Sequence, residues 1–321
     1  MPNFIRSPVP TDRPPANVDE MVSQFVRTLH EDRNGDLWLG TNGDGVIHVA
    51  DDTLVAHRLI DTFGGVAVYE VVEDERGLWF ATSYGVKHHR AGVWTTYGTE
   101  RGLTDDQVWS IARDTAGTIW AGTGTGVARL IGNNFEPFAV PRPDLPDTRP
   151  HLGYERVAAL TVLRDGTVWI AFDGQGITVY RNGAFTFLTT AEGLPDNHVA
   201  DLRQTTNGDV WIGTMYGGIT RFDGHTFHNY MAAGRLPGVE AYNIQEDRAG
   251  NVWFNVEHEG VFRFDGTDFH ALHEQTELPL GGVQSLYPDS QGTLWMATWF
   301  GLFGYQGGIF FRARDRGMRL R

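Results

Sequence analysis

The segment from 255 to 260 concentrates residues that could perform acid–base chemistry. It reads Asn-Val-Glu-His-Glu-Gly, whereas the corresponding segment at 213–218 reads Gly-Thr-Met-Tyr-Gly-Gly. Histidine titrates near neutral pH, and the flanking carboxylates of Glu257 and Glu259 favour a protonated His258. This setting suits a general base, with Glu257 assisting it, or a metal ligand. The alternative is an exposed acidic loop that holds a solvated histidine.

Two more histidines are expected near His258. When the internal repeats described below are aligned, His151 and His198 fall at the same end of neighbouring repeats. His198 is therefore a second candidate base. The three histidines, with Glu257 or Glu240, have the ligand types of a divalent metal site, although their spacing matches no known ligand motif. No other cofactor is expected. The histidines interpreted as surface or packing residues are His48, His57, His88, His89, His225, His228, His270 and His273.

Aligned positions in the first strand of each repeat supply the other candidates. Glu70 and Asp201 are the two acids in one such column, next to a central channel, where burial would raise a carboxyl pKa and where a cation could bind. A water-filled polar channel explains the same column. Neighbouring columns place aromatic and charged residues together, which suits a sugar ring or ordinary packing. The residues expected to bind a ligand are Glu70, Trp109, Arg156, Asp173, Asp201, Tyr216, Glu240, Tyr242, Asn243, Glu259 and Trp299.

These candidates belong to a sevenfold repeat whose marker is a tryptophan followed by small residues and glycines. Subtracting successive positions gives spacings of 41, 41, 49, 42, 42 and 42 residues. A period of ~40–50 residues is typical of propellers and solenoids. The seven marker residues are Trp38, Trp79, Trp120, Trp169, Trp211, Trp253 and Trp295.

Each repeat predicts four short antiparallel strands. In the fifth copy the strands are expected at 199–203, 210–214, 219–222 and 226–230, with Asn-Gly and Asp-Gly hairpin turns between them. Such a sheet has two apolar faces, and stacking the copies in a closed ring buries both. We therefore predict an all-β fold, a seven-bladed β-propeller with four antiparallel strands per blade and almost no helix. The repeated tryptophan is expected between blades.

The ends of the chain leave ring closure open. The proline-rich residues 1–20 predict an extended arm, and residues 21–321 predict a single propeller. Blade seven is expected to supply its own outer strand at 309–312. Closure could then come from packing and the N-terminal arm, or from an exchanged strand. The longest spacing places a proline-stiffened loop at 141–147, which could partly cover the mouth.

Composition limits the partners. The net charge of −14 argues against nucleic acid and anionic membranes, which bind basic surfaces. Without cysteine, disulfides and thiolate sites are excluded. No run of ~18 apolar residues is present to insert into a membrane. The N-terminus lacks an export signal, so we expect a cytoplasmic monomer, or a periplasmic one if the natural chain is longer.

One motif is rejected as a cation loop. Residues 32–36 read Asp-Arg-Asn-Gly-Asp, which resembles the start of a calcium-binding loop. The same turn recurs in the other repeats and lacks the distal bidentate glutamate. We interpret it as a hairpin turn of the repeat.

The phrases at 245–253 (Gln-Glu-Asp-Arg-Ala-Gly-Asn-Val-Trp), at 193–197 (Gly-Leu-Pro-Asp-Asn) and at 211–218 (Trp-Ile-Gly-Thr-Met-Tyr-Gly-Gly) are specific. Together they resemble the two-component-regulator propeller repeat over residues ~21–315. The resemblance implies a sensory domain of the kind found in bacterial hybrid histidine kinases, whose members usually carry two propellers, a further β-domain, a membrane span and a kinase. A more distant resemblance is to virginiamycin B lyase, an enzyme on a similar ring.

Three functions follow as hypotheses. The first is a sensory binding module that takes a small polar ligand, such as a glycan fragment, at its mouth. The second is a lyase or hydrolase in which His258 or His198 is the base, assisted by Glu257, Glu240 or Arg156. The third is a protein-interaction platform, which rests on fold analogy alone.

Overall fold

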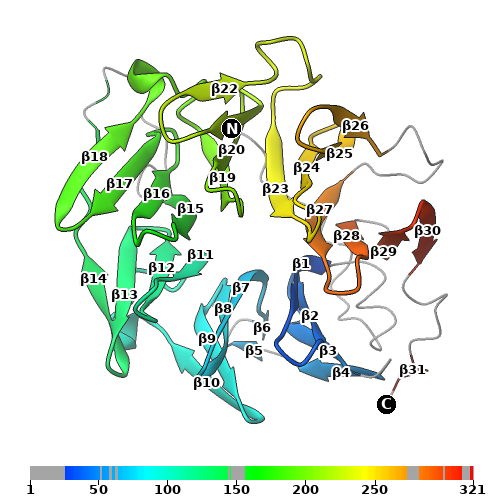
Figure 1. Cartoon of the computed structure of the whole chain (residues 1–321). Coiled ribbons are helices and arrows are strands. Elements are labelled where there is room, and N and C mark those ends of the chain that lie inside the picture. Colours follow the sequence, from blue (N-terminus) through cyan, green and yellow to red (C-terminus); the bar gives the residue numbers. More distant parts are fainter. Residues whose placement is uncertain are drawn as a thin grey trace.

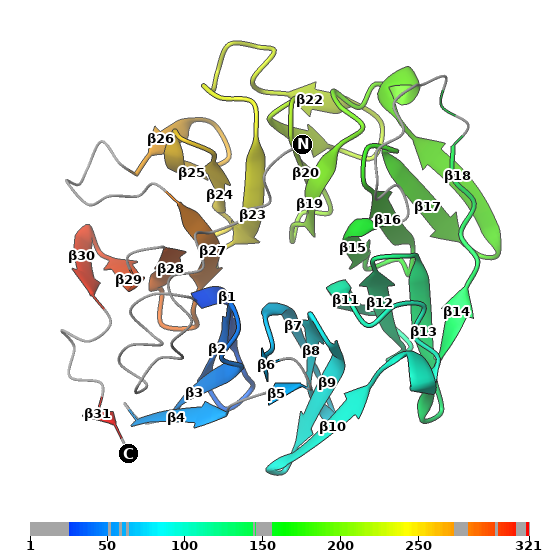
Figure 2. The ribbon, with the colours of Figure 1, turned by 180° about the vertical axis from the view of Figure 1, so that it is seen from behind.

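The computed structural model describes residues 26–50, 53–57, 60–61, 64–143, 145, 156–272, 282–298, 301–312 and 319–320. The arm predicted for residues 1–20 lies outside these residues. Seven four-stranded antiparallel sheets stand in a ring around a central axis, as Figure 1 shows from one side and Figure 2 from the other. The predicted seven-bladed β-propeller is confirmed.

The blades follow one another in chain order around the ring. Blades one to four are β1 (Val26–Glu31), β2 (Leu37–Thr41), β3 (Val46–Ala50) and β4 (Thr53–His57); β7 (Val68–Asp74), β8 (Gly77–Thr82), β9 (Gly85–Arg90) and β10 (Val93–Tyr97); β11 (Val108–Arg113), β12 (Ile119–Thr123), β13 (Val127–Ile131) and β14 (Asn134–Phe138); and β15 (Val157–Val162), β16 (Val168–Phe172), β17 (Ile177–Arg181) and β18 (Ala184–Leu188). Blades five to seven are β19 (Val199–Gln204), β20 (Val210–Thr214), β21 (Ile219–Phe222) and β22 (Phe227–Asn229); β23 (Ala241–Glu246), β24 (Val252–Val256), β25 (Gly260–Phe264) and β26 (Phe269–Ala271); and β27 (Val283–Pro288), β28 (Leu294–Thr298), β29 (Gly301–Gln306) and β30 (Ile309–Arg312).

Short elements connect the blades. A two-stranded ribbon, β5 (Ile60–Asp61) with β6 (Gly64–Gly65), lies between blades one and two. Helix is limited, in the described residues, to two single 3-10 turns, η1 (Thr99–Arg101) and η2 (Thr190–Glu192). The strands predicted for the fifth copy match β19 to β22 within one residue at most ends.

The repeated tryptophan lies on the second strand of each blade and is buried against the next blade. Trp38 packs on a cluster from blade two that includes Val68, Val71 and Phe80, and all seven indoles are no more than 6% exposed. The predicted position between blades is confirmed. Because each strand alternates its side chains between the two faces, this column fixes which residues of β2 and its counterparts face a neighbour.

Blade one and blade seven close the ring by packing and by an added strand. Their side chains share one apolar cluster, and Glu31 of blade one accepts hydrogen bonds from the backbone and hydroxyl groups of Ser290 in blade seven. The chain end β31 (Arg319–Leu320) pairs in parallel with β4 as a fifth strand of blade one (Figure 1). Blade seven supplies its own outer strand, β30, as predicted.

A β-bulge near the start of the innermost strand recurs in six blades. In blade five, for example, Val199 pairs with Thr214 and Asp201 with Gly213, so Ala200 has no partner. The same shift occurs in blades one, two, three, four and seven. A bulge twists the strand locally and redirects side chains. In these six blades the residue at the bulge and the one after it border the central axis.

Candidate functional site

A cavity of about 580 Å³ occupies the centre of the ring. The innermost strand of every blade contributes two consecutive residues, which are the two columns aligned in the sequence; in six blades the first of them is the bulge residue. This volume lies within the range of small-molecule sites. The column pairs are Arg27 and Thr28, Tyr69 and Glu70, Trp109 and Ser110, Ala158 and Ala159, Ala200 and Asp201, Tyr242 and Asn243, and Gln284 and Ser285.

The structure brings together only part of the predicted site. The candidates that line the cavity are Glu70, Trp109, Asp201, Glu240, Tyr242, Asn243, Glu257 and His258. Those that do not line it are Arg156, Asp173, His198, Tyr216 and Glu259. His151 and Trp299, and most of the loop that follows Arg142, lie outside the described residues.

Glu70 and Asp201 connect neighbouring blades as well as lining the cavity. Glu70 Oε2 accepts a hydrogen bond of 2.9 Å from the backbone N–H of Ile111, and Asp201 Oδ2 accepts one of 2.7 Å from Ile244. Each acid thus bonds the innermost strand of the next blade. Both oxygens of Asp201 are used, since Oδ1 accepts from Leu202 at 2.7 Å.

Burial changes the protonation of these two acids. It raises the pKa of Glu70 to about 8, and the negative charge of Asp201 adds to the effect while Arg203 opposes it. Burial also raises the pKa of Asp201, against the hydrogen bonds that favour its carboxylate. Glu70 is consequently mostly a neutral acid near pH 7, able to donate a proton into the cavity.

Blade six carries a coupled group of polar side chains. Tyr242 donates a hydrogen bond from Oη to Glu257 Oε2, and Asn255 also hydrogen-bonds Tyr242. Burial first, and then the bond to Glu257, raise the pKa of Tyr242, so the phenol stays protonated. Burial and the charge of Glu257 raise the pKa of Glu240, whereas His258 lowers it. Two carboxylates therefore share a small region at the cavity edge.

Asn255 is one position at which blade six differs from the other six blades. Its position holds glycine or alanine elsewhere, because the next blade passes very close: a Cβ placed on Gly122 would lie 2.5 Å from Val157 Cγ1. Asn255 is nevertheless 2% exposed. The innermost strand of blade six accordingly has a wider irregularity, between Tyr242 and Gln245.

Two residues of blade six adopt left-handed backbone conformations beside the cavity. Asn243 has φ 59° and His258 has φ 65°. Such conformations are costly for most residues, and asparagine and histidine tolerate them better than β-branched ones. The exchange of small residues for polar ones at 255–260 thus includes His258, which adopts a left-handed backbone although it is not glycine.

Blades one to four form a different sector, built from stacked cations and rings. The Arg27 guanidinium lies 4.9 Å from the Tyr69 ring centroid, and the Tyr69 and Trp109 ring centroids are 4.8 Å apart. Arg156 lies 5.1 Å from the Trp109 centroid and forms a 2.9 Å ion pair with Asp173. The predicted Arg156 and Asp173 therefore support this wall from outside the cavity. Arg27 and Tyr69 were visible in the aligned columns but were not selected as candidates.

His198 belongs to a separate contact at the rim. Its Nδ1 lies 3.1 Å from Asp196 Oδ1, and its ring meets Tyr216 edge to face at 5.2 Å. Asp196 Oδ2 also accepts the backbone N–H of Tyr216 at 3.0 Å. The candidates His198 and Tyr216 thus contact each other, but neither lines the central cavity.

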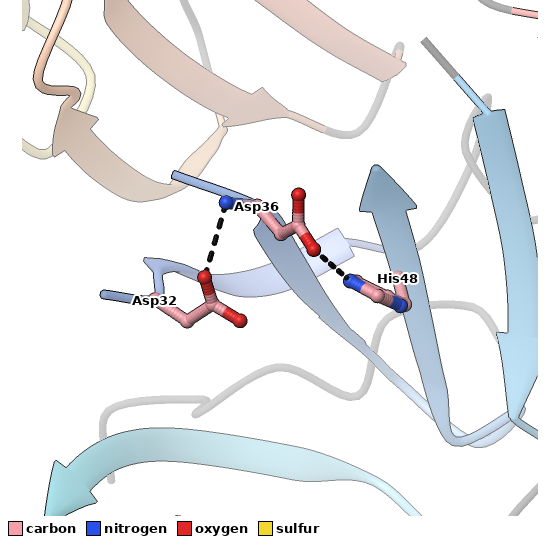
Figure 3. Close-up of side chains that lie close together, drawn as sticks. All are labelled: Asp32, Asp36 and His48. Carbon is pink, nitrogen blue, oxygen red and sulfur yellow. Dashed lines mark hydrogen bonds and ion pairs between the residues drawn. The ribbon is translucent and has the colours of Figure 1, made fainter. Parts of the chain in front are cut away.

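A metal centre at the predicted histidines is not assembled by the described residues. Among them, the grouping whose possible ligand atoms all lie within 4.8 Å of one another is Asp32, Asp36 and His48 in blade one (Figure 3). His198 and His258 are not part of it, and His151 lies outside the described residues. The divalent metal ion stays a prediction.

The Asp32 group has an explanation in the repeat itself. Asp32 Oδ1 accepts the backbone N–H of Asp36, and Oδ2 accepts Trp38 Nε1 at 3.0 Å. In four other blades the repeated tryptophan likewise donates a hydrogen bond from its indole N–H to the turn aspartate. His48 bonds Asp36 at 2.9 Å (Figure 3). Its ring also stacks on Trp38. The same two positions in blade five hold the ion pair of Arg221 with Asp209. This group is therefore a hairpin-turn contact, as the sequence predicted.

The family comparison agrees with this architecture. Residues 20–43, 102–125, 193–216 and 277–300 match the model described as two component regulator propeller. These segments contain the two inner strands of blades one, three, five and seven. Four segments of the chain are therefore similar to repeats of this family. Comparison with curated protein sequences gives no match.

Solved structures with the same fold have different functions. The extracellular domain of the hybrid two component system BT3049 from B. thetaiotaomicron has a TM-score of 0.68 and 19% identity, over 87% of this chain and 39% of that chain. A catalytically inactive virginiamycin B lyase from Staphylococcus aureus with Quinupristin has a TM-score of 0.68 and 13% identity, over 88% of this chain and 94% of that one. PorZ of Porphyromonas gingivalis, a surface component of the type-IX secretion system, has a TM-score of 0.64 and 14% identity. The match covers 88% of this chain and 46% of that chain.

These identities establish a common fold only. The chain spans less than half of the BT3049 domain that it matches. That neighbour is an extracellular domain and PorZ is a surface component, so the comparisons give no support to the cytoplasmic location expected from the sequence. In the described part of the chain, no helix has the length and apolarity to cross a membrane.

Proposed function

We propose that this protein is a sensory-type binding module whose small polar ligand occupies the central cavity. The observation that carries the proposal is the cavity of about 580 Å³ to which all seven innermost strands contribute. A site built by every blade is rigid, because each strand is held by packing on both sides. Rigid positioning of polar groups lowers the entropy lost on binding.

The lining chemistry supports a polar ligand. Aromatic rings at Tyr69, Trp109 and Tyr242 offer flat apolar contact, and carboxyl groups at Glu240 and Glu257 offer hydrogen-bond acceptors. Rings beside polar groups suit sugars and other compact polar molecules. The two-component-regulator propeller repeats support the sensory part of the proposal.

The test is a binding screen with a variant that fills the cavity. Thermal shift followed by calorimetry is run against neutral sugars, uronic acids, amines and amino acids. Ala158 lines the cavity, so Ala158→Trp should weaken binding of any hit by about a hundredfold through steric exclusion. Ala184 is exposed on β18, and Ala184→Trp is the matched control. A hit that binds Ala158→Trp as well as wild type would refute the central site.

Catalysis is the second candidate, because His258, Glu257 and Glu240 line the same cavity. Each hit is therefore also followed by NMR for conversion. Turnover by the wild type that is lost in a folded His258→Ala variant would assign a lyase or hydrolase. Binding without conversion would leave the sensory module as the function.

A further inference from the structure

We propose that the ligand is a zwitterion, with an anionic group seated at Arg27 and an amine seated between Glu240 and Glu257. This inference rests on the proposed function and specifies the ligand class of the same cavity. The inference follows from the positions of the charged side chains in the cavity and from which of them lack an oppositely charged side chain nearby.

Arg27 is a half-buried cation that has no carboxylate partner among the described residues. Among the described residues, its guanidinium contacts are the Asn42 side-chain oxygen, at 2.7 Å from Nη1, and the face of the Tyr69 ring. Neither contact carries a negative charge near pH 7. Burial lowers the pKa of Arg27, which reflects the cost of holding this charge away from water. A ligand anion would offset that cost.

The second seat has the opposite sign. The backbone N–H of Glu257 donates a 2.9 Å hydrogen bond to the carbonyl oxygen of Glu240, and both side chains line the cavity. Burial, and then the charge of Glu257, raise the pKa of Glu240. Glu257 is bonded by Tyr242, a neutral donor. His258 lowers the pKa of Glu240, but the described residues supply no lysine or arginine ion pair to either acid. An ammonium group placed between two carboxylates relieves their repulsion and makes charge-assisted hydrogen bonds to both.

The two seats lie on different blades, and blade seven stands between them. Arg27 is on β1 of blade one, whereas Glu240 and Glu257 flank the inner strands of blade six. Figure 1 shows β27 of blade seven between β1 and β23. Blade seven lines this stretch with uncharged Gln284 and Ser285. A molecule with opposite charges at its two ends would supply a counter-charge to both seats, whereas a purely cationic or purely anionic ligand would leave one seat without a counter-charge.

The test is a series of amino acids with increasing separation of their charged ends. Glycine, γ-aminobutyrate, ε-aminocaproate and triglycine are titrated into the full chain by calorimetry. Each is compared with its one-ended counterparts, such as butylamine and butyrate. At least one zwitterion should bind at least about tenfold more tightly than both of its counterparts.

Two conservative variants assign the ends. Arg27→Gln should remove the preference for the zwitterion over the amine, and Glu257→Gln should remove the preference over the carboxylate. Glu257→Gln keeps an acceptor for Tyr242. Arg90→Gln and Glu136→Gln are controls, since both residues are exposed on outer parts of blades two and three. These controls should leave both preferences unchanged.

The outcomes separate this inference from the proposed function. If neutral sugars bind and Ala158→Trp blocks them, while no zwitterion exceeds its one-ended counterparts, the binding module stands and the zwitterion inference is wrong. If the preferences survive in Arg27→Gln and Glu257→Gln, the assignment of the seats is wrong. If no compound binds in the cavity, both proposals fail.

Discussion

Glu70 shows how a single residue can serve both the fold and the cavity. One oxygen holds the backbone of the next blade at Ile111, and the side chain also lines the cavity. Burial favours the neutral acid, so the pKa is raised to about 8. In the unfolded chain the same group titrates near 4.5. Folding therefore takes up a proton between these two pH values.

This proton uptake predicts a specific stability change. Below pH 4.5 Glu70 is protonated in both the folded and the unfolded chain, so its raised pKa does not change the stability. As pH rises from 4.5 to about 8 the unfolded chain loses this proton first, and the stability of the folded protein falls. Glu70→Gln cannot ionise and keeps an acceptor for Ile111. Relative to wild type, the variant should gain on the order of 2–4 kcal/mol in unfolding free energy between about pH 5 and about pH 9.

Urea denaturation of both proteins at the two pH values measures this gain. Glu136→Gln, on the exposed surface of β14, is the control. Asp247→Asn would not serve, because Asp247 caps a turn. A difference between Glu70→Gln and wild type that does not change with pH would show that Glu70 is ionised in the folded protein.

The hairpin between the two inner strands is the element on which each blade is built. Its first aspartate accepts backbone N–H groups of the turn and the indole N–H of the repeated tryptophan, as in Asp247 with Trp253 at 2.8 Å. The turn and the inter-blade core are thereby fixed together. In blades four and five the position holds Leu163 and Thr205, so those turns use other contacts.

Asp247→Ala should accordingly destabilise the protein by about 1–3 kcal/mol, because a buried indole donor and two turn N–H groups lose their acceptor. Chemical denaturation followed by tryptophan fluorescence measures the loss. Asp268→Ala, on an exposed turn of blade six, is the comparison, with an expected change within roughly 0.5 kcal/mol. Equal effects of the two substitutions would contradict the role given to the turn aspartate.

At the scale of the whole molecule, stability depends on how blade one meets blade seven. Their shared apolar cluster and the Glu31–Ser290 bonds close the ring through side chains. The chain end adds backbone pairing, because β31 lies beside β4. The free edge of β4 is thereby covered, and exposed strand edges are otherwise sites of association.

A chain that ends at Arg312 lacks this added strand and tests its contribution. Loss of the pairing should lower the unfolding free energy by about 1–2 kcal/mol and expose the edge of β4. Thermal unfolding and light scattering measure the two effects. A chain ending at Leu320 is the control. If the shortened chain melts at the same temperature and stays equally dispersed, β31 has no part in closure.

The seven tryptophans and the turn sequences between them were enough to predict the fold, because the repeat period can be read from the sequence without knowing which residues are in contact. The two columns on the innermost strands could also be assigned from the sequence, since the bulge recurs at the same place in six blades. Glu70, Asp201 and Tyr242 were found in this way.

Only the tertiary structure decided which charged residues meet. Arg156 and His198 stand in sequence columns near the mouth, yet Arg156 turns toward Asp173 and His198 toward Asp196. Arg27 and Asn255 became informative once the neighbours of each side chain were known. The physical reason is that a repeat fixes the backbone path of every blade, whereas ion pairs, burial and pKa shifts arise between blades, where each pair of side chains is different.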